Sequence, residues 1–287
     1  MTTDQMLEIR TQLLSAVRDF MGREAASQAA EHDENDTYPS DLVDQMAEMG
    51  LFGMTVPEEY GGLGLDVVTF AMVFEEISKT WMSLTGPIGS HSMLTFAINK
   101  HGTEEQKNHW LPDLAAGKKR GGLALTEPGG GTDVAAMKTR AVKDGEEYVI
   151  NGNKQFITNG RNGGVFLLLA KTDMDTDPPH RGITSFIAEK GPGFTAGKDF
   201  NKLGYRGVDT SELVFQDYRI SEHEVLQGEG NGFYHAMDAL ETGRINVASR
   251  AVGVAQGAFE SAIKYAQQRE TFGRPIASRQ TIQNMLA

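Results

Sequence analysis

The sequence predicts an α+β fold in three consecutive parts: an N-terminal helical domain, a central antiparallel β-barrel or sandwich, and the start of a C-terminal helical bundle. Apolar residues recur at spacings of three and four along the first part of the chain, as in helices with one buried face. From Gly121 to about Ile220, short β-rich runs alternate with Gly, Asn and Asp turns, and helical spacing returns at Gly232. The predicted domains span residues 1–120, 121–228 and 229–287.

The N-terminal part is expected to contain five helices. Thr2 or Thr3 can cap the first of them, because a hydroxyl oxygen accepts a hydrogen bond from the first turn. Asp66 can cap another in the same way, after the Gly-rich break "TVPEEYGGLGL". The expected segments are residues 6–20, 39–49, a helix that begins after Asp66, 82–100 and 104–116.

The central part is expected to contain short strands that form an antiparallel barrel or sandwich. The stretches "KDGEE" and "NGNK" have the composition of hairpin turns, and residues 173–182 form a polar surface loop. Close spacing without intervening helices is typical of antiparallel barrels and sandwiches. The candidate strands are residues 122–126, 148–151, 155–159, 165–171, 183–188 and 212–218.

The C-terminal part begins with a long helix from Gly232 to about Arg269. A break at "TFGRPIA" follows, and Ser278 is placed to cap a further helix with Ile282, Met285 and Leu286 on one face. The sequence ends about two turns into that helix, without a C-cap glycine. We therefore expect a chain truncated within the C-terminal helical domain.

The composition excludes several classes of function. The 287 residues carry a formal net charge of −12, which argues against nucleic acid as the main partner. There is no cysteine, so thiol nucleophiles and thiolate metal sites are excluded, and the histidine spacings predict no metal site. The N-terminus has no secretory or transit pattern, and the longest apolar run is far too short for a membrane span. A cytoplasmic protein is expected.

The stretch "ALTEPGGGTD", residues 124–133, is a candidate ligand loop. It is no P-loop, because no Lys follows the glycines. It is no dinucleotide fingerprint either, because Val134 takes the third glycine position and the following residues predict a hairpin rather than a crossover helix. An ordinary turn and a polar cofactor site both remain open, since the loop offers free backbone N–H groups between the Thr126 and Thr132 hydroxyls.

A second stretch, "NGNKQFITNG", has a similar character. It places an aromatic ring, Phe156, and a hydroxyl, Thr158, two residues apart on one predicted strand. Because alternate residues of a strand point to the same face, these two side chains are expected to lie side by side.

These two stretches, in this order, resemble the acyl-CoA dehydrogenase family. Further stretches resemble it in the same order and cover essentially the whole chain: "VPEEYGGLGL", "HGTEEQKNHWLPDLAAGK", "LGYRGVDTSELVF" and "YAQQRETFGRPI". The family architecture of helical, β and helical domains agrees with the prediction made from periodicity.

The resemblance implies FAD as cofactor and an acyl-CoA thioester as substrate. The residues that match flavin contacts in the family are Leu123, Leu125, Thr126, Gly131, Thr132, Phe156, Ile157, Thr158, Arg279 and Gln280, with Arg269, Glu270 and Thr271 reaching the FAD of a neighbouring subunit. The residues that match acyl-CoA contacts are Thr132, Glu241, Thr242, Gly243 and Arg244.

The implied reaction is α,β-dehydrogenation, with electrons passed to an electron-transfer flavoprotein, in a homotetramer. The family uses a catalytic Glu near the C-terminus or, in some members, one residue before the Arg that matches Arg244. Here that residue is Gly243, and Glu241 points about 60° away around the helix. No catalytic residue is therefore assigned, and the base is expected beyond Ala287.

Alternatives remain open within this interpretation. The chain could be a non-catalytic flavin or acyl-CoA binding remnant, which the missing base would explain. It could also be an acyl-CoA oxidase or a flavin monooxygenase of the same fold. Arg206 and Arg219 could face a CoA phosphate or be solvated surface residues.

Overall fold

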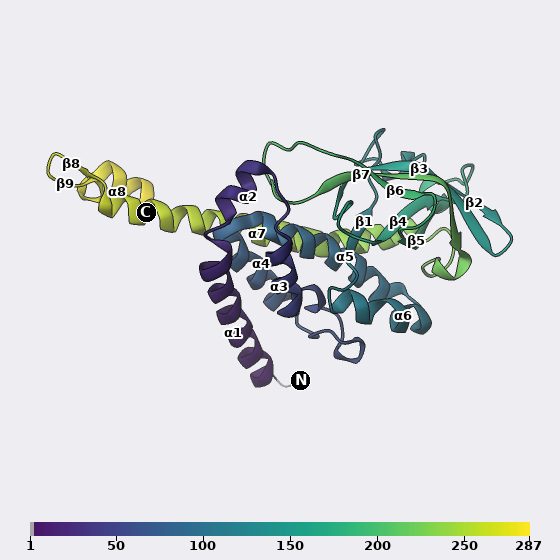
Figure 1. The fold of residues 1–287 in the computed structure, drawn as a ribbon, viewed down its shortest axis with the longest axis horizontal. Helices are drawn as coiled ribbons and strands as arrows, with labels where there is room; N and C mark the ends of the chain where they lie inside the picture. Colours follow the sequence, from purple (N-terminus) through teal and green to yellow (C-terminus); the bar gives the residue numbers. More distant parts are fainter. Residues whose placement is uncertain (1–2) are drawn as a thin grey trace.

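The computed structural model describes residues 3–287 and confirms the predicted α+β class. Figure 1 shows the sheet at one end of the molecule and the N-terminal helices beside it. One long helix, α7, runs from the sheet past these helices and extends beyond them to the C-terminal end of the chain (Figure 1). The described part of the chain contains no helix that is both long and apolar enough to cross a bilayer.

Two of the described N-terminal helices begin at capping side chains. The Asp66 carboxylate accepts a hydrogen bond of 2.8 Å from the Thr69 N–H, which confirms the predicted cap. Thr103 and Gln106 form a reciprocal capping box at the start of another helix. Of the two predicted caps of the first helix, Thr2 and the side chain of Thr3 both lie outside what the structure describes. The helices are α1 (Thr3–Phe20, followed by a π-helical turn, Met21–Ala25), α2 (Ala29–Asn35), α3 (Ser40–Glu48), α4 (Val67–Trp81), α5 (Thr85–His101) and α6 (Glu104–Ala115).

The β part is one curled sheet of seven strands. Its order is β1-β4-β2-β3-β7-β6, with β5 on the other side of β4. All pairs are antiparallel except β1 with β4 and a short contact of β2 with β4. The strands are β1 (Gly121–Ala124), β2 (Arg140–Asp144), β3 (Glu147–Thr158), β4 (Val165–Lys171), β5 (Ile183–Glu189), β6 (Phe194–Asp199) and β7 (Thr210–Ser221).

One predicted hairpin is correct and the other is wrong. "KDGEE" forms the turn between β2 and β3, where Gly145 has a φ of +66°. "NGNK" forms no turn, because β3 continues through it and both halves pair with β7 across two register shifts. Gly152 is needed there for space, since a Cβ would lie 2.5 Å from the Thr139 hydroxyl oxygen. Strand β6 and helix α2 were not predicted, and β2 was expected only as the first arm of the "KDGEE" hairpin, without bounds.

Strand β4 joins two hydrophobic cores, because both of its faces are buried. Phe166 and Leu168 face the inside of the curled sheet. Val165 and Leu167 face the other way and pack with residues of α5, α6 and α7. A third core lies within the N-terminal helices. The second of these cores fixes α5 and α7 against the sheet, and the candidate site lies near their meeting point.

Helix α7 (Gly232–Gln268) packs against α4 and α5. After it come the short strands β8 (Glu270–Thr271) and β9 (Arg274–Pro275) and the helix α8 (Gln280–Leu286). The predicted cap of α8 is wrong, because Ser278 donates its hydroxyl to the Pro275 carbonyl at 2.7 Å and Arg279 holds the cap position without a side-chain cap.

Candidate functional site

The two candidate cofactor stretches lie against each other in the structure. The Gln155 N–H donates to the Thr126 carbonyl at 2.8 Å, which ties the end of β3 to the chain that follows β1. Leu123 is buried, whereas Leu125 and Thr126 are half-buried. One backbone hydrogen bond thus joins two stretches that lie about thirty residues apart in the sequence.

We call the candidate ligand loop, residues 124–133, the glycine loop. It contains a tight turn, and part of its backbone is accessible. Glu127 and Gly130 exchange backbone hydrogen bonds of 3.0 and 3.1 Å, which fixes the turn. A Cβ at Gly129 would meet nothing within 4 Å, and at Gly131 it would meet the Thr126 side chain at 3.2 Å. The N–H groups of Gly131 and Thr132 have no hydrogen-bond partner among residues 3–287. The loop therefore presents free donors to a ligand.

A buried ion pair that the sequence did not reveal holds this loop. The Glu127 carboxylate lies 2.8 Å from the Lys154 ammonium and also accepts from the backbone N–H groups of Lys138 and Thr139 at 2.6 and 3.0 Å. Lys154 also donates to the Leu125 carbonyl at 3.1 Å. Burial opposes ionisation, but the Lys154 charge and the hydrogen bonds keep the pKa of Glu127 below its ordinary value.

Phe156 sits at a bulge of β3. Its φ is +59°, and the register with β7 shifts between Lys154 and Ile157. The Phe156 side chain is 56% exposed and its ring lies 4.6 Å from that of Phe200. Ile157 is buried, at 3% exposure, and Thr158 is half-buried. Phe156 and Thr158 are thus both accessible on either side of a buried residue. The bulge breaks the regular alternation of the strand, so the expectation that these two side chains lie side by side stays a prediction.

A cavity of about 660 Å³ opens beside Thr158. Its walls come from α5, α7, the end of β3 and the loop between β6 and β7. The lining is mostly small or apolar, with a few polar side chains. The lining residues are Gly86, Gly89, Ser90, Met93, Thr158, Tyr205, Leu240, Gly243, Arg244, Asn246, Val247, Ala248, Arg250 and Ala251.

The predicted substrate residues divide at this cavity. Gly243 and Arg244 line it, whereas Glu241 and Thr242 do not. A Cβ at Gly243 would meet the Met93 sulfur at 3.0 Å, so the glycine lets α7 approach α5 closely. Thr132 is exposed on the glycine loop and does not line the cavity either. Within residues 3–287, no Asp or Glu lines the cavity.

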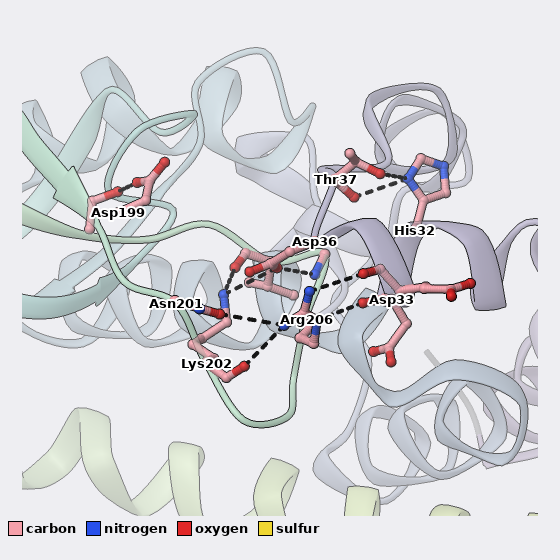
Figure 2. A network of polar contacts seen from close by, with 12 residues as sticks. His32, Asp33, Asp36, Thr37, Asp199, Asn201, Lys202 and Arg206 are labelled. Atoms are coloured by element: carbon pink, nitrogen blue, oxygen red, sulfur yellow. Dashed lines mark hydrogen bonds and ion pairs between the residues drawn. The ribbon is translucent and has the colours of Figure 1, made fainter.

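The loop between β6 and β7 is tied to the N-terminal helices, as Figure 2 shows. Arg206 donates to the backbone carbonyls of Asp33 and Glu34, at 2.7 and 3.0 Å, and the Gly207 N–H donates to Asp36 at 2.8 Å. Tyr205, next to Arg206, is thereby held in the cavity wall.

Arg206 and Arg219 were expected either to face a CoA phosphate or to be solvated surface residues. In the structure both side chains have partners within the chain. Arg206 is engaged with α2 as described, and Arg219 forms ion pairs with Asp144 and Glu147 at 2.8 and 2.9 Å. Arg206 thus joins the loop to α2, whereas Arg219 lies in a surface ion-pair cluster with its side chain 53% exposed.

The C-terminal candidates lie far from the glycine loop, at the extended end of the molecule (Figure 1). Arg279 donates to the Thr271 hydroxyl and carbonyl oxygens at 2.9 and 3.0 Å, so these two residues do meet. Arg269 and Glu270 are exposed, as is Gln280. This chain alone does not bring the five residues together with Thr126 or Thr158.

Three family models match the chain in the order of its parts. They are the acyl-CoA dehydrogenase N-terminal domain over residues 8–118, the middle domain over residues 122–218 and the C-terminal domain over residues 230–287. The chain belongs to the acyl-CoA dehydrogenase family. Members of this family are FAD-dependent oxidoreductases that act on a CH–CH bond.

Individual relatives agree with the family models. An acyl-CoA dehydrogenase of Bacillus subtilis is 42% identical over 273 residues, which are 94% of this chain and 72% of the relative. The solved butyryl-CoA dehydrogenase of Megasphaera elsdenii is 36% identical with a TM-score of 0.94, covering all of this chain and 74% of that one. A chain from a study of the electron transferring flavoprotein of Acidaminococcus fermentans is 38% identical with a TM-score of 0.93, covering 100% of this chain and 74% of the other.

The residues around the glycine loop fit a flavin. An isoalloxazine ring needs an apolar surface together with hydrogen-bond donors at its polar edge. Phe156 offers an exposed aromatic face, and the N–H groups of Gly131 and Thr132 and the Thr126 and Thr158 hydroxyls offer polar partners. The absence of side chains at Gly129 and Gly131 leaves room for a ligand to approach the backbone.

Proposed function

We propose that the chain binds FAD along the glycine loop and the end of β3, and an acyl-CoA thioester in the neighbouring cavity. One observation supports this most strongly. Thr158, the last residue of the second flavin-matching stretch, lines the same cavity as Gly243 and Arg244 of the acyl-matching stretch. Cofactor-matching and substrate-matching residues from two distant parts of the chain thus share one space.

The proposed reaction is the α,β-dehydrogenation of the thioester. The Cα–H bond gives up a proton and the Cβ–H bond a hydride, and a C=C bond forms between the two carbons. FAD, when bound, supplies the acceptor for the hydride. The chain's own contribution is to hold the acyl group between α5 and α7 with both C–H bonds aligned and with little water present. We assign the proton to no residue of this chain, because the cavity lining among residues 3–287 contains no carboxylate.

The proposed flavin contacts are those predicted from the sequence. Leu123, Leu125, Thr126, Gly131, Thr132 and residues 156–158 would hold the flavin of the same chain. Arg269, Glu270 and Thr271 would serve the flavin of another subunit, as the resemblance implies. Because Arg279 and Gln280 lie with them at the opposite end of α7, we assign these two residues to that flavin as well. A homotetramer and electron transfer to an electron-transfer flavoprotein are parts of the same proposal, and the relative from Acidaminococcus fermentans supports the second.

The test is an anaerobic titration with saturated acyl-CoA thioesters of the FAD-loaded protein purified from its own cells, so that any segment beyond Ala287 is present. We expect loss of the visible flavin absorbance and a product lighter by two hydrogen atoms in mass spectra. If FAD binds but no thioester of any chain length reduces it, the proposed reaction is wrong. If oxygen rapidly reoxidises the reduced flavin and peroxide is released, the protein is an acyl-CoA oxidase, and oxygen rather than an electron-transfer flavoprotein accepts the electrons.

A further inference from the structure

One end of the cavity is polar, which an alkyl chain does not require. Asn246 and Arg250 follow each other by one helical turn on α7 and both line the cavity. Tyr205 reaches the same region from the loop between β6 and β7. The other lining residues nearby on α7, Val247, Ala248 and Ala251, are small or apolar.

The Arg250 guanidinium has only neutral partners. It donates to the Tyr205 hydroxyl at 2.7 Å and to the Thr85 carbonyl at 3.3 Å, and the rings of Phe74 and Tyr205 lie 5.6 and 5.4 Å from its central carbon. No carboxylate forms an ion pair with it in the described part of the chain. Its Nε is buried without a hydrogen-bond partner. A partly buried cation therefore lacks an anion.

Asn246 adds a second unsatisfied group at the same place. Its side chain is 2% exposed, and its Oδ1 has no hydrogen-bond partner. This Oδ1 cannot pair with a carboxylate, because both groups only accept hydrogen bonds. The Asn246 Nδ2 can donate to one, and it lies beside the Arg250 guanidinium, since a Cβ at Gly89 would lie 3.3 Å from the Asn246 Nδ2 and closer still to the Arg250 Nη2. Gly89 of α5 makes the room, because a Cβ at this position would collide with the Arg250 guanidinium.

We propose that the cavity accepts an acyl group whose far end carries a carboxylate, so that the substrate is a dicarboxylic acid joined to CoA through one of its two carboxyl groups. The carboxylate supplies the anion for Arg250 and accepts a hydrogen bond from the Asn246 Nδ2. An alkyl end of the same length would leave both groups unpaired in an apolar surrounding. This inference rests on the proposed function, because it assigns the cavity to the acyl group.

The test compares binding of matched thioesters to the full-length, FAD-loaded protein by isothermal titration calorimetry. Succinyl-, glutaryl- and adipyl-CoA are each paired with the alkyl thioester of equal carbon number: butyryl-, pentanoyl- and hexanoyl-CoA. We expect at least one carboxylate-ended thioester to bind about 10- to 100-fold more tightly than its alkyl partner, as expected for a hydrogen bond to a charged group. If every alkyl thioester binds as tightly as its carboxylate partner, the inference is overturned while the proposed function stands.

Variants assign the preference to these residues. Arg250→Gln should abolish most of the preference, and Asn246→Leu should weaken carboxylate-ended thioesters and strengthen alkyl ones. Lys264→Gln is the matched control, because Lys264 is an exposed cation of the same helix that does not line the cavity. An unchanged preference in a folded Arg250→Gln protein contradicts the inference. If no thioester binds at all, the proposed function fails together with it.

Discussion

At the scale of single residues, the buried pair of Glu127 and Lys154 connects the flavin-matching stretches. Replacing the carboxylate by an amide in Glu127→Gln leaves the Lys154 ammonium, which is 0% exposed, without an anion. Breaking one partner of a buried ion pair costs about 3–5 kcal/mol. We expect a lower free energy of unfolding in urea and a lower ratio of flavin to protein after purification.

The matched control is Glu222→Gln. Glu222 pairs with Lys143 at 2.8 Å, but both side chains are partly exposed, at 37% and 52%. Exposed pairs contribute about 0–1 kcal/mol, so flavin content and stability should stay close to those of the original protein. Equal behaviour of the Glu127 and Glu222 variants would contradict the role given to the buried pair.

Two buried histidines, His91 and His235, should make the folded protein less stable at acid pH. Burial lowers the pKa of His91 to about 3, and burial with the nearby His101 lowers that of His235 to about 4. In the unfolded chain both return to about 6.5, so below that pH the unfolded state binds more protons and is favoured. The free energy of unfolding should fall by about 1.4 kcal/mol per pH unit for each histidine between pH 6.5 and 4.

The measurement is urea unfolding at several pH values in this range. His235→Gln should remove one histidine's share of the slope, because the neutral amide titrates nowhere in the range. An identical slope in the His235 variant and the unsubstituted protein would show that this histidine is protonated in the folded state.

Sequence reasoning found the residues of the glycine loop and the end of β3, but not what holds them. Local composition carries the free N–H groups and the aromatic ring, so both could be predicted. Lys154 lies 27 positions from Glu127, and nothing in the spacing relates the two. Asn246 and Arg250 were missed because, in the sequence alone, they do not differ from the ordinary polar residues of a helix.

At the scale of elements, the contact between α4 and α7 depends on glycine. A Cβ at Gly253 would collide with the Glu75 carbonyl oxygen of α4. Gly253→Ala should therefore force the helices apart and cost about 1–3 kcal/mol, as overpacking does. Thermal unfolding measures the effect.

The same substitution at Gly22 is the control for helix propensity. A Cβ there would meet nothing within 4 Å, so Gly22→Ala should leave stability unchanged or raise it by about 0.5–1 kcal/mol. If both alanine variants gained stability, α4 and α7 would have space for a side chain at position 253, which would contradict the close contact seen in the structure.

The elements that sequence reasoning missed are those whose local signals are ambiguous. "NGNK" has the composition of a turn, but pairing of β3 with β7 on both sides of Gly152 carries the strand through it. The long helix α7 was predicted nearly to its bounds, because an apolar period sustained over many turns needs no tertiary information. The three domain divisions stay a prediction, and the core shared by α5, β4 and α7 shows that these parts are not packed independently.

At the scale of the whole molecule, the far half of α7 and the segment after it extend away from the body (Figure 1). Large apolar side chains are exposed there; they are Val252, Val254, Phe259, Tyr265, Phe272 and Met285. Exposed apolar surface of this extent marks an interaction site. The proposed oligomer would cover this surface and bring Arg269 and Thr271 to another subunit's flavin.

Phe272→Asp tests this arrangement. The Phe272 ring is 94% exposed between β8 and β9, and it contacts the Arg279 guanidinium, whose central carbon lies 5.2 Å from the ring centre and with which a carboxylate can pair instead. If a second subunit covers it, the buried charge should weaken the assembly, and light scattering should show a lower native mass together with a lower flavin content. Leu203→Asp is the control, because Leu203 is also fully exposed but lies in the loop between β6 and β7. If the Phe272 variant kept both its mass and its flavin, this end of the molecule would be no subunit contact, and Arg269, Glu270 and Thr271 would lose their proposed role.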